Sequence, residues 1–431
     1  MPLTDPAEIN SRYRYWRTRI LYASFFGYAV YYFCRVNISM AIPQMQSDLG
    51  YSKSQIGLIV SGLQLAYGLG KFANGILADR ANPRYFMALG LLLSGVVNIV
   101  FGLSASLVVL MVLWAANGWF QSMGFPPGAR LLSHWYSPTE YGRIWGIYGC
   151  SHQVGAAIVL VVVGYLVQFG WKTAFVVPGI LAIAVALLLV ERLRDIPASL
   201  GLPPVELHRK DVIDPTRIAA IERPLSIRET LLELVLNNRA IWYIAFGNLF
   251  LYVARYGALT WAPTFIKEAK GVQLSTAGWM MALFEVLGIA GMLSAGWVSD
   301  RVFRTRRGPV MAVYMLGATL AMLVFWLAPA SLPWVFGLAL GACGFFIYGP
   351  LMLVSVAATG FAGKKAAATA SGFTGLWGYA GAVISGVGIG WVAQHHGWGA
   401  GFVVLAASGV LSAACFALTW NVGARGVETR A

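Results

Sequence analysis

The feature that most constrains this chain is a series of apolar stretches, each about as long as a bilayer is thick. A helix needs about 20 mostly apolar residues to span the hydrocarbon core of a membrane. Twelve stretches of the 431-residue sequence meet this requirement. They lie at residues 20–45, 55–78, 84–105, 108–131, 143–169, 172–193, 239–265, 275–298, 309–328, 331–357, 366–392 and 398–420. The sequence therefore predicts an all-α membrane protein with twelve transmembrane helices.

The composition excludes the soluble classes of protein. Hydrophobic residues make up 58% of the chain and charged residues 11%, whereas an average soluble domain carries about 25% charged residues. A chain of this composition lacks the polar surface that it would need to fold in water. It also shows no soluble domain and no arrangement typical of a catalytic nucleophile. We therefore expect neither an enzyme nor a disordered or fibrous protein.

The cysteines give no sign of a metal or redox site. All four (Cys34, Cys150, Cys343 and Cys415) lie inside apolar stretches, without the paired spacing of a metal-binding motif. Buried free cysteines commonly behave as small apolar residues. We therefore predict no disulfide, no metal site and no cofactor.

The positive charges predict the orientation of the chain in the membrane. A net charge of +14 would suggest nucleic acid if it were gathered on one face, but here Lys and Arg fall between the apolar stretches. Of the 31, four lie on one side (Lys53, Lys172, Lys267 and Lys270), three lie inside stretches, and the others all lie on the opposite side. By the positive-inside rule, both termini and the central loop are cytoplasmic. We expect no nucleic acid partner.

The two parts of the chain resemble each other. A polar segment, 194–238, separates an N-terminal half, 1–193, from a C-terminal half, 239–431. FGYAVYYFCR (Phe26–Arg35) aligns with FGNLFLYVAR (Phe246–Arg255), and GILADR (Gly75–Arg80) aligns with GWVSDR (Gly296–Arg301) at nearly the same offset. This repeat predicts two pseudo-symmetric six-helix halves with a substrate site between them near the middle of the membrane.

Five ionisable residues stand out well inside the predicted spans, where lipid disfavours them. They are Arg35, Lys71, His152, Arg255 and Glu285. A charged side chain near the centre of a span costs at least about 2.5–3.5 kcal/mol, so such residues normally face a cavity and have a function. Arg35 and Arg255 occupy equivalent positions of the repeat. We therefore expect them on opposite walls of one cavity.

This cluster of cations predicts an anion site. Arginine presents a planar fork that grips a phosphate through two hydrogen bonds. The alternative is that each arginine pairs structurally with a carboxylate, but only Glu285 is available to the three buried cations. Glu285 itself could pair with a site cation or bond to neighbouring helices. His152 could donate to phosphate, tune proton coupling, or be a satisfied core histidine.

Tyrosines accompany the cations at helical spacing. Tyr28 and Tyr32 precede Arg35 by seven and three residues, and Tyr67 and Tyr252 precede Lys71 and Arg255 by four and three. Residues at such spacings share a helix face. Their hydroxyls could bond to substrate oxygens and their rings could support a sugar, although aromatic stripes usually serve packing.

Several motifs resemble a known family. GILADR and its repeat resemble the Gly-x-x-x-Asp-Arg motif of the major facilitator superfamily. Other segments resemble its organophosphate:phosphate antiporter family, and RYRYWRTRIL (Arg12–Leu21) resembles the hexose-phosphate transporter and sensor branch. These segments are YYFCR (Tyr31–Arg35), AYGLGKFANGILADR (Ala66–Arg80), GWFQSMGFPPGARLL (Gly118–Leu132), SHQVG (Ser151–Gly155), RDIPASLGLPP (Arg194–Pro204), YVARYGALTWAPTF (Tyr252–Phe265) and GFTGLWGYAGA (Gly372–Ala382).

The resemblance implies which residues form the site. It implies that Arg35 and Arg255 bind the phosphoryl group with Lys71 and His152 close by. It also implies cavity roles for Tyr28, Tyr32, Tyr67, Tyr252, Tyr348 and Tyr379. The chain departs from the family pattern at Val36, where relatives usually carry Lys, at Thr260, where they often carry Asp, and at Gly149, where they carry Asn. The organic part of the substrate therefore stays open.

The resemblance and the charges together favour one function and leave alternatives. The chain is expected to be a monomeric antiporter of a bacterial inner membrane that exchanges inorganic phosphate for a sugar phosphate by rocker-switch alternating access. A receptor that senses external hexose phosphate and signals to a partner histidine kinase is the alternative. A proton-coupled carrier of neutral sugars would depend on Glu285.

Charged residues at the cytoplasmic ends of the second and eighth spans predict a gate. Asp79 and Arg80 end one span, and Asp300 and Arg301 end its counterpart in the repeat. We expect contacts between carboxylates and guanidiniums there to hold the outward-facing state.

Overall fold

The computed structural model of the chain is a bundle of long helices. It describes residues 5–137, 140–209, 235–303, 306–362 and 367–422. The longer helices before the central segment are α1 (Pro6–Phe33), α2 (Asn37–Leu49), α3 (Lys53–Arg80), α4 (Pro83–Leu103), α5 (Leu107–Gln121), α6 (Phe125–Trp135), α7 (Tyr141–Leu166) and α8 (Thr173–Arg192). Those after it are α12 (Arg239–Lys270), α13 (Leu274–Arg301), α14 (Arg307–Leu327), α15 (Pro333–Ala362) and α16 (Ala367–Ala417). The described residues contain no strand.

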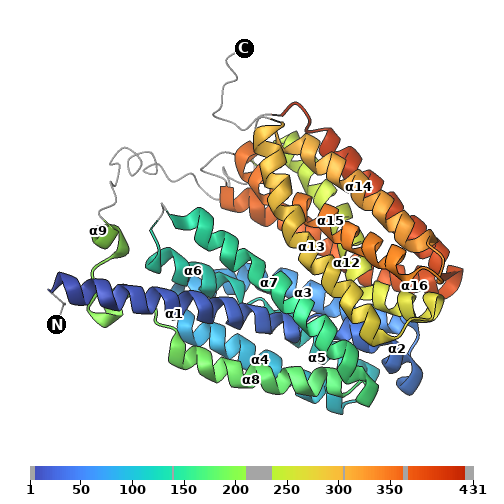
Figure 1. Ribbon diagram of the computed structural model, residues 1–431, viewed down its shortest axis with the longest axis horizontal. Helices are drawn as coiled ribbons and strands as arrows, with labels where there is room; N and C mark the ends of the chain where they lie inside the picture. Colours follow the sequence, from blue (N-terminus) through green and yellow to red (C-terminus); the bar gives the residue numbers. More distant parts are fainter. Residues whose placement is uncertain (1–4, 138–139, 210–234, 304–305, 363–366, 423–431) are drawn as a thin grey trace.

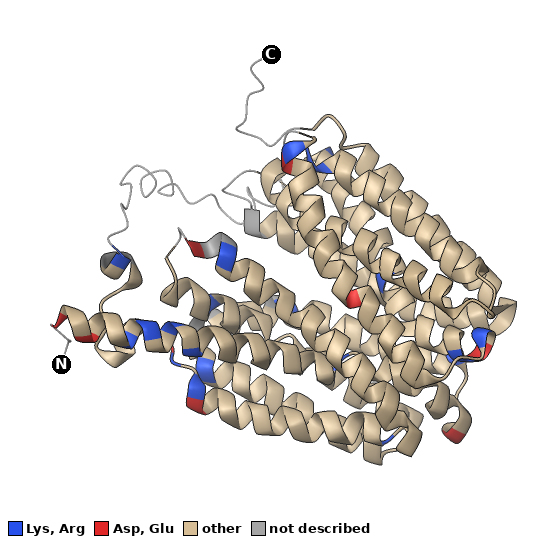
Figure 2. Cartoon of the chain, viewed as in Figure 1, with Lys and Arg blue, Asp and Glu red and all other residues tan. Residues whose placement is uncertain are grey.

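These helices provide twelve spans within the described residues. Eight segments are long and apolar enough to cross a membrane, and the longest of them, within α16, contains two spans. The remaining spans are α1 with α2, α3 and α12, which carry the candidate site cations Arg35, Lys71 and Arg255. Figure 2 shows that Lys and Arg gather at the end of the bundle that carries the N-terminus and α9, whereas the middle is nearly free of charge.

Two spans that were predicted as single helices are broken. The first span divides into α1 and α2 around Cys34–Val36, and the fourth divides into α5 and α6. Two helices meet at Gly397 within α16, where φ is +78°, so the predicted gap at residues 393–397 contains the turn between the last two spans. Glycine adopts this left-handed conformation without steric penalty, so it permits the sharp turn between two spans.

The break in the first span is stabilised by polar side chains of neighbouring helices. A helix interrupted inside a membrane frees backbone groups that lipid cannot satisfy. The carbonyl of Cys34 accepts hydrogen bonds from Asn117 Nδ2 at 2.6 Å and Asn98 Nδ2 at 3.2 Å, and the carbonyl of Tyr31 accepts one from Gln121 Nε2 at 2.9 Å. Helices α4 and α5 therefore hold Arg35 in a non-helical turn.

The two halves lean together at one end and diverge at the other (Figure 1). We call the end where α2 ends and α3 begins the closed side, and the end where α1 begins and α3 ends the open side. Glycines bring the halves together at the closed side: a Cβ at Gly57 of α3 would collide with the backbone of Gly386 in α16, and one at Gly278 of α13 with that of Leu160 in α7. Small residues allow such close approach between membrane helices.

Polar contacts add to this seal. The Ser61 hydroxyl donates to the Val383 carbonyl at 2.8 Å and accepts from the Val387 N–H at 3.0 Å. These two groups of α16 are the pair that an uninterrupted helix joins to each other, so Ser61 inserts into the partner helix. An ion pair between Lys53 Nζ and Glu268 Oε2, at 2.9 Å, also joins the halves at this side.

At the open side, the start of the central segment folds back onto the N-terminal half. Residues 194–209 include a short 3-10 helix, Pro197–Leu200, and α9 (Val205–Arg209). The ring of His208 stacks on that of Tyr13 at 4.0 Å, and Glu140 pairs with both Arg17 at 2.6 Å and Arg209 at 2.7 Å. The remainder of the predicted linker, from residue 210 to 234, lies outside the described residues.

Candidate anion-binding site

Arg35 lies at the boundary between the halves. The break between α1 and α2 directs its guanidinium towards α12, where Nη2 donates to the hydroxyl of Tyr256 at 3.0 Å. Its Cζ is 4.0 Å from the ring centroid of Tyr67 and 5.4 Å from that of Tyr32. The residue is only 5% exposed. A buried guanidinium in this position is surrounded by neutral aromatic groups.

Arg255 lies on α12 in the other half and is equally buried, at 4% exposed. Its Nη2 donates to the hydroxyl of Tyr348 at 3.1 Å, and that hydroxyl donates to Glu285 Oε2 at 2.6 Å. The Nε of Arg255 and the Oε1 of Glu285 have no hydrogen-bond partner within the described residues. The carboxylate therefore reaches the arginine through a tyrosine rather than by direct contact.

Three of the predicted tyrosines and the lysine complete the wall formed by α3, α12 and α16. The ring of Tyr379 lies 5.1 Å from that of Tyr67 and 5.6 Å from that of Tyr252. The Lys71 ammonium is 5.8 Å from the Tyr379 ring, but its side chain is exposed, unlike the two arginines. Lys71 therefore stands at the edge of the cluster.

His152 of α7 lies on the opposite wall. Its ring is 5.4 Å from that of Tyr32 and 6.1 Å from that of Tyr348. Its Nδ1 lies 2.6 Å from the carbonyl of Gly149. A carbonyl only accepts hydrogen bonds, so Nδ1 carries a proton. In the neutral ring, Nε2 is then an acceptor, suited to a substrate hydroxyl.

Tyr28 packs against other tyrosines of the N-terminal half. Its ring is 5.7 Å from those of both Tyr32 and Tyr148. The structure therefore brings all ten residues of the predicted binding set into one connected group, with Lys71 at its margin.

Tyr256 is the residue that the sequence analysis missed. Its hydroxyl accepts from Arg35, and its ring centroid is 4.8 Å from Arg255 Cζ. Helical spacing relates residues three, four or seven positions apart, which share a helix face. Tyr256 directly follows Arg255 and is the repeat counterpart of Val36. Because Arg35 lies outside a helix, helical spacing could not reveal its partner across the interface.

The predicted gating residues are only partly described. Asp300 Oδ1 pairs with Arg307 Nη1 at 2.6 Å, which is a contact within the C-terminal half. Arg301 is exposed. The side chains of Asp79 and Arg80 lie outside the described part of the structure.

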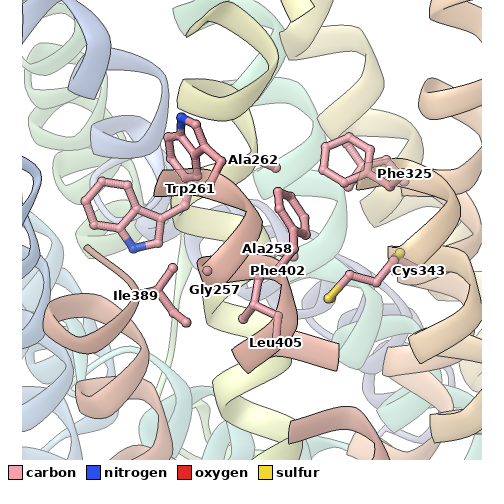
Figure 3. Close-up of a pocket in the computed structure, with 13 residues that line it drawn as sticks. Gly257, Ala258, Trp261, Ala262, Phe325, Cys343, Ile389, Phe402 and Leu405 are labelled. Atoms are coloured by element: carbon pink, nitrogen blue, oxygen red, sulfur yellow. The ribbon is translucent and has the colours of Figure 1, made fainter. Parts of the chain in front are cut away.

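The cavity in Figure 3 is a different kind of space. It lies inside the C-terminal half and is lined by apolar and aromatic side chains, including Trp261, Phe325, Cys343 and Phe402. Its lining contains no charged residue. A phosphate would lose its hydration there without compensation, so this cavity is not the candidate site.

The arrangement around Arg35 and Arg255 favours an anionic ligand. Two guanidiniums from different halves converge on the same tyrosine, and the described residues place one carboxylate, Glu285, nearby. No ion pair joins either arginine to a carboxylate in the part of the chain that the structure covers. Their charge thus remains available to a ligand that carries several acceptor oxygens.

A comparison with protein families shows to which family the chain belongs. Residues 24–386 match the model of the Major Facilitator Superfamily. The chain belongs to this superfamily. The match confirms the predicted recognition and the twelve-helix fold.

Curated relatives within the Major Facilitator Superfamily cover almost the whole chain. A probable hexose phosphate transport protein of Chlamydia pneumoniae is 40% identical over 100% of this chain and 96% of its own length. A glycerol-3-phosphate transporter of Bacillus subtilis is 41% identical over 98% of this chain and 96% of its own. A membrane sensor protein of Escherichia coli is 38% identical over 95% and 94%. These relatives agree with the organophosphate:phosphate antiporter branch that the motifs resemble.

A solved structure shows the same superfamily fold at low sequence identity. A bacterial homologue of the lysosomal transporter Spinster, described as inward-facing and unoccupied, superposes with a TM-score of 0.75 at 18% identity. The alignment covers 94% of this chain and 95% of that one. This likeness concerns the fold.

The departures from the family pattern meet in space. Val36 and Thr260 line one small cavity, together with Arg35 and Tyr256. A lysine at the first position and an aspartate at the second would place opposite charges in the same space. Opposite charges at these two positions would therefore be neighbours.

Proposed function

We propose that this protein is a secondary transporter that exchanges inorganic phosphate for a phosphorylated small molecule, with a sugar phosphate as the favoured substrate. The observation that carries the proposal is the buried pair Arg35 and Arg255, which come from different halves and form no ion pair within the described residues. The names of the relatives, which include hexose phosphate and glycerol-3-phosphate transporters, support this substrate class.

The mechanism follows from the charges at the interface. A phosphoryl group between Arg35 and Arg255 accepts hydrogen bonds from both halves and draws them together. Without an anion, two cations face each other in a medium of low dielectric constant, which opposes closure around an empty site. The loaded carrier can then change between its inward-facing and outward-facing states. After it has carried one substrate across the membrane, it must bind another before it can change back.

The remaining residues have roles that follow from their positions. Lys71, at the margin, attracts the anion towards the arginines. The tyrosine hydroxyls and Nε2 of His152 bond to the sugar, whose hydroxyls both donate and accept. The bias of positive charge supports an inner-membrane protein with both termini in the cytoplasm. In this orientation the open side is cytoplasmic, and Asp79 and Asp300, with neighbouring arginines, form the contacts that close it.

Purified protein in liposomes tests the proposal. Vesicles are loaded with unlabelled phosphate and given labelled phosphate outside, and uptake is compared with that of vesicles without internal phosphate. We expect rapid uptake only in the loaded vesicles. Competition by glucose 6-phosphate, glycerol 3-phosphate, phosphoglycerate and an alkyl phosphonate then ranks the substrates. Equal uptake with and without internal phosphate would exclude exchange.

A receptor is the second candidate, favoured by the 38% identity to a membrane sensor protein. It would use the same site and signal to a partner kinase. Binding of a sugar phosphate to the purified protein, with no exchange in loaded liposomes, would assign the chain to this class.

A further inference from the structure

One side chain stands between the two arginines. The Tyr256 hydroxyl accepts a hydrogen bond from Arg35 Nη2 at 3.0 Å, and the centroid of its ring lies 4.8 Å from Arg255 Cζ. Tyr256 belongs to α12 of the C-terminal half, whereas Arg35 belongs to the N-terminal half. Tyr256 is 6% exposed. This hydrogen bond therefore crosses the interface between the halves in a buried place.

The chemistry of this contact resembles that of a bound anion. The guanidinium of Arg35 donates to an oxygen, as it would to a phosphoryl group. The face of the Tyr256 ring, which carries partial negative charge, lies towards the guanidinium of Arg255. One neutral side chain thus interacts with both cations, through its oxygen and its ring respectively. A hydrogen bond to a charged donor is roughly twice as strong as a neutral one.

We propose that Tyr256 is a positioning residue that ties the two halves together through Arg35 whenever no substrate occupies the site. When the site holds no substrate, its hydroxyl accepts a hydrogen bond from Arg35, and this bond joins the two halves. A phosphoryl oxygen displaces the hydroxyl, and Arg35 exchanges one acceptor for another. The inference rests on the proposed function and adds to it the element that couples release of this tie to substrate binding.

This hydrogen bond raises a barrier to the movement of the two halves, and the bound substrate removes that barrier. An empty carrier must break the hydrogen bond between Arg35 and Tyr256 before the halves can move apart. A loaded carrier has already replaced it. Tyr256 therefore favours the exchange of one substrate for another over the return of an empty carrier. The repulsion between the arginines acts in the same direction.

Tyr256→Phe separates this role from packing, because it keeps the ring and removes the hydroxyl. In liposomes, the rate of phosphate efflux into phosphate-free medium is divided by the rate of phosphate self-exchange. From the strength of a hydrogen bond to a charged group, we expect this ratio to rise about tenfold in the variant. The matched control is Tyr165→Phe, which removes another hydroxyl between the halves, where Trp279 Nε1 donates at 3.2 Å in an exposed place. We expect the control ratio to equal that of the wild type.

Calorimetric titration of the purified protein with inorganic phosphate provides a second readout. Because Arg35 no longer has to leave Tyr256, Tyr256→Phe should bind phosphate about fivefold or more tightly. An unchanged flux ratio, or a fall of both fluxes in proportion, would overturn the coupling role. Unchanged or weaker phosphate binding would overturn the displacement of the hydroxyl. A wild type that binds phosphate but does not exchange it would contradict the proposed function, and the titration would still test Tyr256.

Discussion

At the scale of single residues, Arg255 and Glu285 show how a buried charge can stay available. Direct contact with a carboxylate would neutralise the guanidinium, whereas Tyr348 stands between them with hydrogen bonds of 3.1 and 2.6 Å. Glu285 is 1% exposed, and one of its oxygens has no partner among the described residues. The carboxylate therefore depends on Tyr348 for its compensation.

Tyr348→Phe is expected to destabilise the protein. The substitution would leave Glu285 without the hydroxyl bond, and an unsatisfied buried group costs about 1–3 kcal/mol, or more when charged. Thermal unfolding in detergent should show a lower midpoint for this variant than for Tyr314→Phe, in which a buried hydroxyl loses only its neutral partner Ser294, at 2.9 Å. Equal midpoints for the two variants would show that Glu285 does not rely on Tyr348.

At the scale of elements, the broken first span explains which features the sequence could predict. Apolar length revealed the spans, and the repeat paired Arg35 with Arg255. No proline or glycine lies at the break to indicate it in the sequence. Its stabilisation depends on Asn98 and Asn117, which are distant in sequence and look like ordinary polar residues of apolar helices. Non-local hydrogen bonds of this kind, and with them the partner of Arg35, could not be inferred from local patterns.

Close approach of α3 and α16 gives a second prediction at this scale. A Cβ at Gly57 would meet the Gly386 carbonyl and the Val387 Cα, both backbone atoms, so the helices must separate. Gly57→Ala should therefore open the closed side. Gly62→Ala on the same helix is the matched control, because its Cβ would meet only ordinary contacts at 3.7 Å.

Accessibility of a buried reporter measures this opening. The reporter position is Val60, which is 4% exposed and lines the small cavity near Arg35. The substitution Val60→Cys is made in a variant from which the four native cysteines have been removed. A water-soluble thiol reagent should label the reporter faster with Gly57→Ala than with Gly62→Ala. The same rate in both would mean that this approach does not control the closed side.

At the scale of the whole molecule, two titratable groups with shifted pKa values hold the start of the central segment on the N-terminal half. Partial burial acts to raise the pKa of Glu140, but the hydrogen bond and charge of Arg17 outweigh it and keep this pKa below its usual 4.5. Burial, with the charges of Arg209 and Arg17, lowers the pKa of His208 below its usual 6.5. A group whose pKa is lowered in the docked state favours docking above its ordinary pKa and loses that contribution as the pH falls.

Docking of α9 should therefore weaken in mildly acidic solution. Between about pH 5 and 6.5 the undocked His208 gains a proton that the docked form resists, while Glu140 stays ionised. Hydrogen exchange in residues 203–209, corrected for the intrinsic effect of pH, should be faster at about pH 5.5 than at about pH 7.5. His208→Gln should remove this difference. If the difference persists in His208→Gln, another group controls docking.

The central claim is that guanidiniums from both halves bind one phosphate. Lysine keeps the charge but loses the planar fork, so Arg35→Lys and Arg255→Lys remove hydrogen bonds worth about 1.5–3 kcal/mol each. Calorimetric titration of the purified variants with inorganic phosphate tests this most directly, with Lys71→Arg as the control at the margin of the site. We expect phosphate binding to weaken about tenfold or more in each Arg→Lys variant and to change less in Lys71→Arg. Wild-type affinity in either Arg→Lys variant would contradict the two-arginine site.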